Sequence, residues 1–278
     1  MPNYFHNADL QYLTIYPYDV IVNVFNQILN DTNIEFNYPQ GGCQQRAQIM
    51  SMLLNKKFQI DHCKVWLFAP VVLEENQYQT LYINDVFDLT NQDEIQWNYH
   101  VAPVVQVEKD GNISTMVIDP SIVKNEPVFL STWFYAIGNS EVSKYTFMLP
   151  DKYFFNCVYN NTNELTTIFD GSFYNYEEDD KNDLTLEKGL ALNDVAIAVF
   201  NKHIKLHASA STKQIYDLKE IFGNATAMDF LFAQNLSGKT DETKLRYVLT
   251  NYTHIFTEAR DLFSKRVVYW TSITNTLI

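Results

Sequence analysis

One cysteine of the 278-residue chain stands where its thiol could act as a nucleophile. Cys43 follows Pro39, Gly41 and Gly42, residues that break regular structure and let the backbone turn tightly. Apolar residues then recur at steps of three and four through 43–54, which is the spacing of one helix face. At a helix N-terminus, free backbone N–H groups and the helix dipole favour an anion. The sequence therefore predicts that Cys43 ionises readily and forms a reactive thiolate.

A histidine and an aspartate on a predicted β-hairpin could transfer and hold protons for that thiol. Two runs of strand-forming residues flank Asp110–Gly111, a favoured two-residue hairpin turn. We expect this turn to pair Lys109 with Asn112 across the two strands. In that register His100 and Asp119 are diagonal neighbours on one face, roughly 7 Å apart. An imidazole and a carboxylate within such reach can serve as a general base and the group that orients it.

The elements that must position these residues can be read from hydrophobic periodicity. Residues 18–30 carry pairs of apolar side chains every four residues and predict an amphipathic helix beside the Cys43 helix. The Cys43 helix should end near 55–57, where two lysines suit the helix dipole. Residues 62–69 predict a strand. The polar, acidic stretch 71–95 is interpreted as a surface excursion, with a weak strand signal at 79–83.

The second half of the chain has a different character. Residues 145–173 are crowded with Tyr, Phe and Asn and suggest short strands, and we interpret 177–183 as a solvated acidic linker, not a calcium loop. The remainder reads as helical, most clearly as one helix over 240–270. The expected fold class is α+β, with a catalytic domain over 1–150. Residues 151–278 then form a C-terminal region of short strands followed by helices.

Composition limits the classes of function. With 46% hydrophobic residues the chain is an ordered globular protein, and its net charge of −13 argues against a nucleic-acid partner. The sequence contains no run of eighteen apolar residues, so it predicts no membrane span. Its N-terminus lacks the features of a signal peptide. A trimmed sequence would be compatible with a secreted or surface-associated protein. An untrimmed one would be cytoplasmic or exported without such a signal.

The remaining reactive side chains have simpler interpretations. Cys63 and Cys157 fit either free thiols or a disulfide outside the cell. His203 and His207 stand four apart on a predicted helix but lack a third ligand, so we predict no metal site. Arg46 is interpreted as solvated in preference to a substrate clamp. No phosphate-binding loop or other cofactor motif is present in the sequence, and we expect no cofactor.

The order of helix-borne cysteine, strand histidine and following aspartate is that of papain-like and transglutaminase-like thiol enzymes. Three segments make the resemblance more specific: GGCQQRAQIM at 41–50, WNYHVA at 97–102 and VIDPSI at 117–122. They resemble the three catalytic segments of the bacterial protein-glutaminases, which deamidate glutamine side chains in proteins. The resemblance covers about residues 35–135 and does not extend into the C-terminal half. It implies a core with the cysteine on a helix and the other two residues on an antiparallel sheet.

The resemblance also implies a mechanism and a triad of Cys43, His100 and Asp119. The thiolate attacks a carboxamide carbon, and backbone N–H groups, including that of Cys43, hold the oxyanion. His100 gives a proton to departing ammonia and then acts as base for a water that hydrolyses the thioester. Asp119 fixes the imidazole tautomer and supports the imidazolium.

Three neighbours are candidates for binding the substrate: Gly42, Trp97 and Tyr99. Alternation along a continuous strand would send Trp97 to the face opposite His100. We therefore interpret Trp97 as a packing residue first and a pocket wall second.

Two alternatives remain open at this stage. A cysteine peptidase or transglutaminase of the same fold would differ only in the leaving or accepting group. A non-catalytic interaction protein would use the C-terminal helices as its working surface, although the intact triad argues against it. The expected partner is a glutamine-containing protein or peptide, the helices are expected to select or block it, and the oligomeric state is not indicated.

Overall fold

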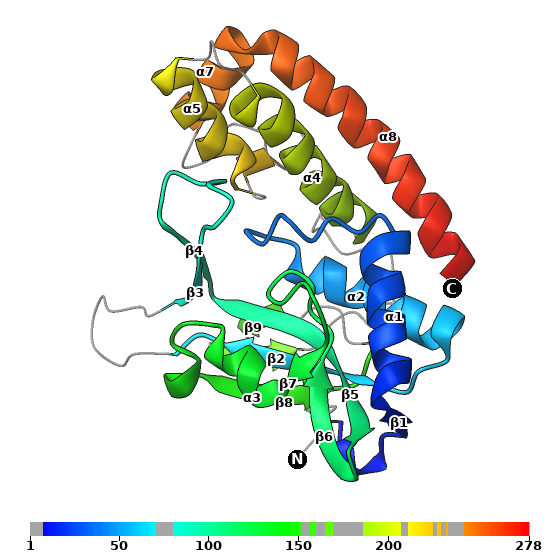
Figure 1. The fold of residues 1–278 in the computed structure, drawn as a ribbon. Helices are drawn as coiled ribbons and strands as arrows, with labels where there is room; N and C mark the ends of the chain where they lie inside the picture. The colour runs from blue at the N-terminus through cyan, green and yellow to red at the C-terminus, as the bar shows by residue number, and fades with distance from the viewer. Residues whose placement is uncertain are drawn as a thin grey trace.

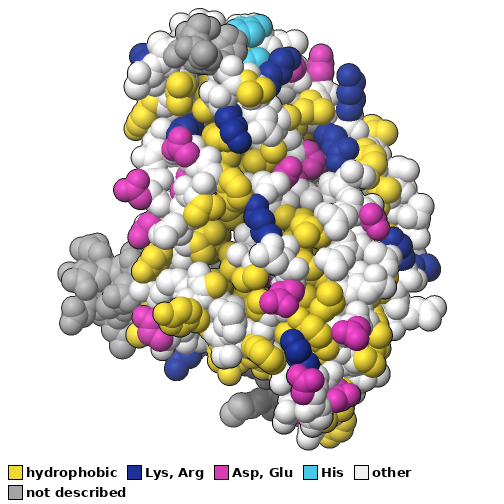
Figure 2. Space-filling model, in the orientation of Figure 1, with side chains coloured by type: hydrophobic (Ala, Val, Ile, Leu, Met, Phe, Trp, Pro, Cys, Tyr) yellow, Lys and Arg dark blue, Asp and Glu magenta, His cyan; other side chains and the backbone are white. Residues whose placement is uncertain are grey.

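A computed structural model describes residues 8–70, 80–151, 156–159, 165–168, 186–206, 211–224, 227–228, 232 and 242–277. Figure 1 shows a sheet-containing layer with the N-terminus and a layer of helices that ends at the C-terminus. The chain therefore combines helices with a mostly antiparallel sheet, as predicted for an α+β fold. In Figure 2, hydrophobic side chains run down the middle of this face, and lysines and arginines are scattered over it.

The central sheet has six strands in the order β7-β6-β5-β2-β8, with β1 also pairing with β5. Strand β5 (Tyr99–Lys109) pairs antiparallel with β6 (Asn112–Val117), and Lys109 faces Asn112 as predicted. The other side of β5 is shared by β2 (Cys63–Phe68), antiparallel, and β1 (Ile15–Pro17), parallel. The edge strands are β7 (Val128–Phe129) and β8 (Lys144–Met148).

Two helices cover β5. Helix α1 (Tyr18–Asp31) buries Ile21, Phe25 and Ile28, so the predicted amphipathic helix is confirmed. Helix α2 (Cys43–Leu53) begins at Cys43, as the glycine turn predicted, and continues as a π-helical turn over Leu54–Phe58. Because α2 packs directly on β5, the elements that carry Cys43 and His100 are neighbours.

Smaller elements surround this core. The described part of the 71–95 excursion is a hairpin of β3 (Leu81–Asn84) and β4 (Glu94–Trp97), close to the weak strand signal. Helix α3 (Leu130–Tyr135) follows β7, and β9 (Asn156–Tyr159) pairs with β10 (Leu165–Ile168) among the predicted short strands. Short 3-10 turns lie at Leu10–Tyr12 and Ser140–Val142.

The C-terminal helices are α4 (Leu186–Val199), α5 (Thr212–Phe222), α7 (Glu242–Asn251) and α8 (Thr253–Leu277), with a π-helical turn at Phe200–Lys205. No helix in the described ranges is long and apolar enough to cross a membrane.

The prediction of one continuous helix over 240–270 is wrong, because α7 ends at Asn251 and α8 begins at Thr253. Side chains at the break bond to carbonyls of the preceding turn: Asn251 Nδ2 to Tyr247 O at 2.9 Å and Thr253 Oγ1 to Leu249 O at 2.7 Å. Such local bonds bend helices.

The helical layer shares a hydrophobic core with the sheet layer. One buried cluster joins Met50 of α2 and Val105 of β5 to Leu190 of α4 and Trp270 of α8. A second cluster is built mainly from α4, α5, α7 and α8. Since α4 packs on α2 as well as α8, the C-terminal helices stand beside the start of α2.

Candidate active site

The backbone around Gly42 positions Cys43. Gly42 caps α2 with φ 72° and ψ 19°, the left-handed region that glycine enters without strain. Space is also limited there, because a Cβ atom at Gly42 would lie 2.5 Å from Nδ2 of Asn193 on α4. A residue of the C-terminal region therefore packs against the turn that presents Cys43.

His100 and Asp119 lie side by side, with His100 Nε2 2.8 Å from Asp119 Oδ2. The ladder between β5 and β6 ends at Val117, but a bond from Ile118 N to Pro103 O keeps the chain beside β5 for one more step. Both side chains are buried, at 1% and 4% exposure. The imidazole and the carboxylate thus meet on one face, out of water.

Two further side chains hold the Asp119 carboxylate, and sequence reasoning missed both. Trp133 Nε1 donates to Oδ2 at 2.9 Å, and Ser121 donates to Oδ1 through Oγ at 2.5 Å and N at 3.2 Å. Burial raises the pKa of Asp119, but His100 and these two donors outweigh it, so the pKa lies below its ordinary value. The Asp-x-Ser spacing was a usable signal for Ser121, whereas nothing local pointed to Trp133.

Aromatic rings enclose His100 on two sides. The ring centroid of Trp97 lies 4.8 Å from that of His100, and the centroid of Trp133 lies 5.6 Å away, both stacked. The expectation that Trp97 faces away from His100 is wrong, because β4 ends at Trp97 and β5 begins only at Tyr99, so alternation does not carry across the break. Trp97 Nε1 also donates to Pro39 O at 2.8 Å, which ties β4 to the turn before Cys43.

The second ring nitrogen of His100, Nδ1, has no hydrogen-bond partner among the described residues. Burial lowers the pKa of His100, but Asp119 and the Cys43 thiol outweigh it and raise the pKa to about 9. The Cys43 thiol itself lies 3.5 Å from Gln44 Oε1 and 4.0 Å from Tyr99 O. With Nε2 engaged by Asp119, Nδ1 is the ring nitrogen that remains available to a neighbouring group.

Arg46 is not solvated, contrary to the sequence interpretation. Its side chain is 2% exposed, and its Nη1 donates to Tyr38 O and to Gly41 O, each at 2.8 Å. The periodicity around Cys43 did not reveal this, because the partners of Arg46 lie in the turn before the helix and not on the helix itself.

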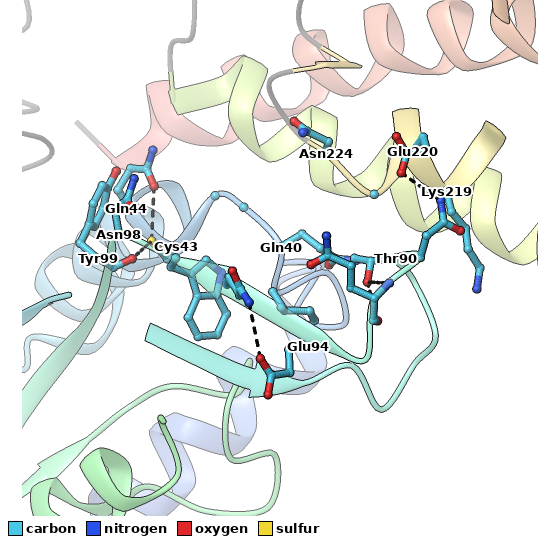
Figure 3. Close-up of a pocket in the computed structure, with 18 residues that line it drawn as sticks. Gln40, Cys43, Gln44, Thr90, Glu94, Asn98, Tyr99, Lys219, Glu220 and Asn224 are labelled. Atoms are coloured by element: carbon cyan, nitrogen blue, oxygen red, sulfur yellow. Dashed lines mark hydrogen bonds between the residues drawn. The ribbon is translucent and has the colours of Figure 1, made fainter. Parts of the chain in front are cut away.

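A cavity of about 620 Å³ opens at the start of α2. The three predicted substrate-binding residues, Gly42, Trp97 and Tyr99, line it together with Cys43. Figure 3 shows Cys43 at one end beside Gln44 and Tyr99, with Lys219 and Glu220 of α5 on the far side. The cavity thus lies between the β3–β4 hairpin and a helix of the C-terminal region.

The other candidates stay outside this site. His203 Nε2 lies 3.2 Å from Glu258 Oε2, His207 falls outside the described residues, and no metal-binding cluster of three ligands occurs in the part of the chain described. Cys63 carries a free buried thiol whose pKa burial raises to about 12. The side chain of Cys157 lies outside the description.

A match to a protein-family model indicates the class of enzyme. Residues 21–137 match the family model described as Glutaminase, and this segment contains Cys43, His100 and Asp119. The protein is therefore an amidohydrolase. This match agrees with the resemblance of the sequence to the bacterial protein-glutaminases.

Solved structures of protein-glutaminases are similar at low identity. The NMR structure of protein-glutaminase from Chryseobacterium proteolyticum is 20% identical, covering 72% of this chain and 94% of that one, with a TM-score of 0.43. A crystal structure of protein-glutaminase is 19% identical, covering 72% and 97%, with a TM-score of 0.43. A crystal structure of pro-protein-glutaminase is 20% identical, covering 74% and 64%, with a TM-score of 0.42. No curated protein matches the chain.

Proposed function

We propose that the protein deamidates glutamine side chains of proteins or peptides to glutamate, through a thioester on Cys43 in a papain-like or transglutaminase-like core. One observation carries this proposal: a buried His100–Asp119 pair at 2.8 Å, with the second imidazole nitrogen unoccupied, beside a cysteine at a helix start. The glutaminase match supports an amide as the bond that is broken.

The first half of the reaction forms the thioester. His100 takes the proton of the Cys43 thiol at Nδ1, and the thiolate attacks the carboxamide carbon of glutamine. The oxyanion forms at the N-terminus of α2, where the backbone N–H of Cys43 and the helix dipole stabilise negative charge. The imidazolium then gives its proton to the amide nitrogen, the C–N bond breaks and ammonia leaves.

The second half returns the thiol. His100 takes a proton from a water, whose oxygen attacks the thioester carbon, and the C–S bond breaks to give glutamate and the Cys43 thiolate, which the imidazolium can reprotonate. Asp119 holds the Nε2 proton throughout and stabilises the imidazolium when it forms. No net oxidation or reduction takes place.

The lining of the cavity supports an exposed glutamine on a larger chain as the substrate. The cavity exceeds the needs of one side chain, and both its walls carry amide side chains, including Gln40, Gln96 and Asn224. Its far wall comes from α5 and the turn after it, so the C-terminal helices would set which segment enters. We propose this as their role, with no catalytic group supplied by them.

The test is to incubate the protein with a glutamine-bearing peptide, an intact protein and a primary amine together, while measuring ammonia, chain cleavage and amine incorporation. The proposal predicts ammonia release with neither cleavage nor incorporation. Cleavage would instead indicate a peptidase, and amine incorporation a transglutaminase. No reaction with any substrate would favour an interaction protein.

A further inference from the structure

Arg46 is a buried cation on the same helix as the nucleophile. Cys43 and Arg46 stand three residues apart on α2, so their side chains lie on one face, with Cβ atoms roughly 5–6 Å apart. The guanidinium is 2% exposed and stays protonated in proteins. Moving such a charge out of water is unfavourable unless partners compensate it.

The hydrogen bonds of Arg46 go to the backbone that leads into Cys43. Nη1 bonds to Tyr38 O and Gly41 O, and Trp97 Nε1 bonds to Pro39 O between them, each at 2.8 Å. Three carbonyl oxygens of the turn 38–42 are therefore fixed by side chains. Two of these bonds come from Arg46 and one from a ring that stacks on His100.

The hydrogen bonds of Arg46 Nη1 go to carbonyl oxygens, not to carboxylates. Burial lowers the pKa of Arg46, and the acidic groups that oppose this effect are, in decreasing order, Cys43, Asp119, Glu35 and Tyr38. When Cys43 and His100 form a thiolate–imidazolium pair, the buried set of Cys43, His100, Asp119 and Arg46 sums to zero. Without the Arg46 charge, the same set would hold one uncompensated negative charge out of water.

We propose that Arg46 is a positioning residue that holds the turn before Cys43 and whose buried charge favours the Cys43 thiolate. The inference rests on the proposed function only in taking Cys43 as the nucleophile.

Several other titratable groups face Cys43 or line its cavity. They are Arg46 on α2, His100 and Tyr99 on β5, Asp119 after β6, Glu94 on β4, and Lys219 and Glu220 on α5. Lys219 is paired with Asp88, and α4 contributes the neutral Asn193.

The experiment follows alkylation of Cys43 by iodoacetamide as a function of pH, with the modified residue identified by peptide mass mapping. Arg46→Met and Arg46→Gln remove the charge, and Arg46→Lys keeps it. Arg246→Met, which removes an exposed cation from α7, is the matched control. An opposite charge at this range shifts a pKa by roughly 1–3 units, so the neutral variants should move the alkylation midpoint up by about one pH unit or more.

The lysine variant and the control should keep the midpoint of the parent. In deamidation, the neutral variants should lower kcat with little change in KM. A folded neutral variant with the parental midpoint would overturn the proposal, and so would a lysine variant that shifts as far as the neutral ones. Loss of folding in all three variants would assign Arg46 to stability alone and overturn it too.

Alkylation needs no substrate, which separates the two proposals. If the parent protein released no ammonia from any substrate, the proposed function would fail while the midpoints still decided the role of Arg46.

Discussion

At the scale of single residues, the best-defined feature is the carboxylate of Asp119. It accepts hydrogen bonds from His100, Trp133 and Ser121, which leaves it one orientation. That orientation fixes the imidazole of His100 through Nε2, and in the proposed mechanism it thereby sets the direction of proton transfer at Nδ1.

Asp119→Asn should lower kcat by several orders of magnitude without abolishing it, because the imidazole remains but loses its tautomer and its counter-charge. His100→Ala should remove activity altogether. Trp133→Phe, which keeps the stacked ring but loses one donor, is the matched control and should cost about tenfold, or roughly 1.4 kcal/mol. Steady-state deamidation rates measure all three. An Asp119→Asn variant with parental activity would show that the carboxylate does not orient His100.

The pKa of His100 leads to a second prediction. Since this pKa is raised to about 9, the imidazolium should persist well above neutral pH, and kcat/KM should fall as pH rises through about 9. The stability that the His100 charge contributes to the fold also decreases as pH rises. This stability is fully present below the pKa of the unfolded state, about 6.5, and is lost as pH rises through the pKa of the folded state. Asp119→Asn should move the alkaline fall in kcat/KM to lower pH. A fall already centred near 6.5 in the parent would contradict the assignment.

At the scale of elements, the start of α2 depends on a glycine for two separate reasons. Gly42 has a left-handed φ and no room for a Cβ atom beside Asn193, whereas Gly111 in the hairpin turn has φ 78° and open space around it. The comparison separates backbone strain from crowding.

Gly42→Ala should therefore destabilise the fold by roughly 1–3 kcal/mol and reduce deamidation at least tenfold, because α4 and the Cys43 turn must move apart. Gly111→Ala carries the strain alone and should leave deamidation unchanged. Urea unfolding and ammonia release measure the two effects. Equal activity in both variants would mean that the contact with Asn193 does not position Cys43.

The hairpin and the start of α2 show which features can be predicted from sequence. The hairpin register followed from the Asp-Gly turn, and the start of α2 followed from Gly42, because both depend on local backbone chemistry. The contact of Asn193 with Gly42 depends on α4 packing on α2, and the buried bonds of Arg46 depend on the path of the turn before Cys43. The hydrophobic periodicity of α2 reports neither. Trp133 likewise reaches Asp119 only through the placement of α3.

At the scale of the whole molecule, the shared core connects the helical layer to the catalytic elements. Leu190 of α4 is 1% exposed and belongs to the same cluster as Met50 of α2 and Val105 of β5. Leu190→Ala should cost about 2–5 kcal/mol of unfolding free energy. Leu206→Ala, at a side chain that is 76% exposed, should change it by less than about 0.5 kcal/mol.

Both layers should unfold in one transition. Exposure of the Cys63 thiol reports on β2, and the part of the tryptophan fluorescence change that a Trp270→Phe variant loses reports on α8, because the chain has four tryptophans. Separate midpoints for the two probes would show that 1–150 and the C-terminal helices fold independently. In that case, truncation within 177–183 should leave deamidation of small peptides intact.

The central claim is that Cys43 is the nucleophile of a glutamine deamidase, and the most direct measurement is ammonia release from a glutamine-bearing protein. The parent and a Cys63→Ala control should release ammonia at similar rates, and Cys43→Ala should release none while keeping the circular dichroism spectrum of the parent. Comparable ammonia release by a folded Cys43→Ala variant would contradict the account.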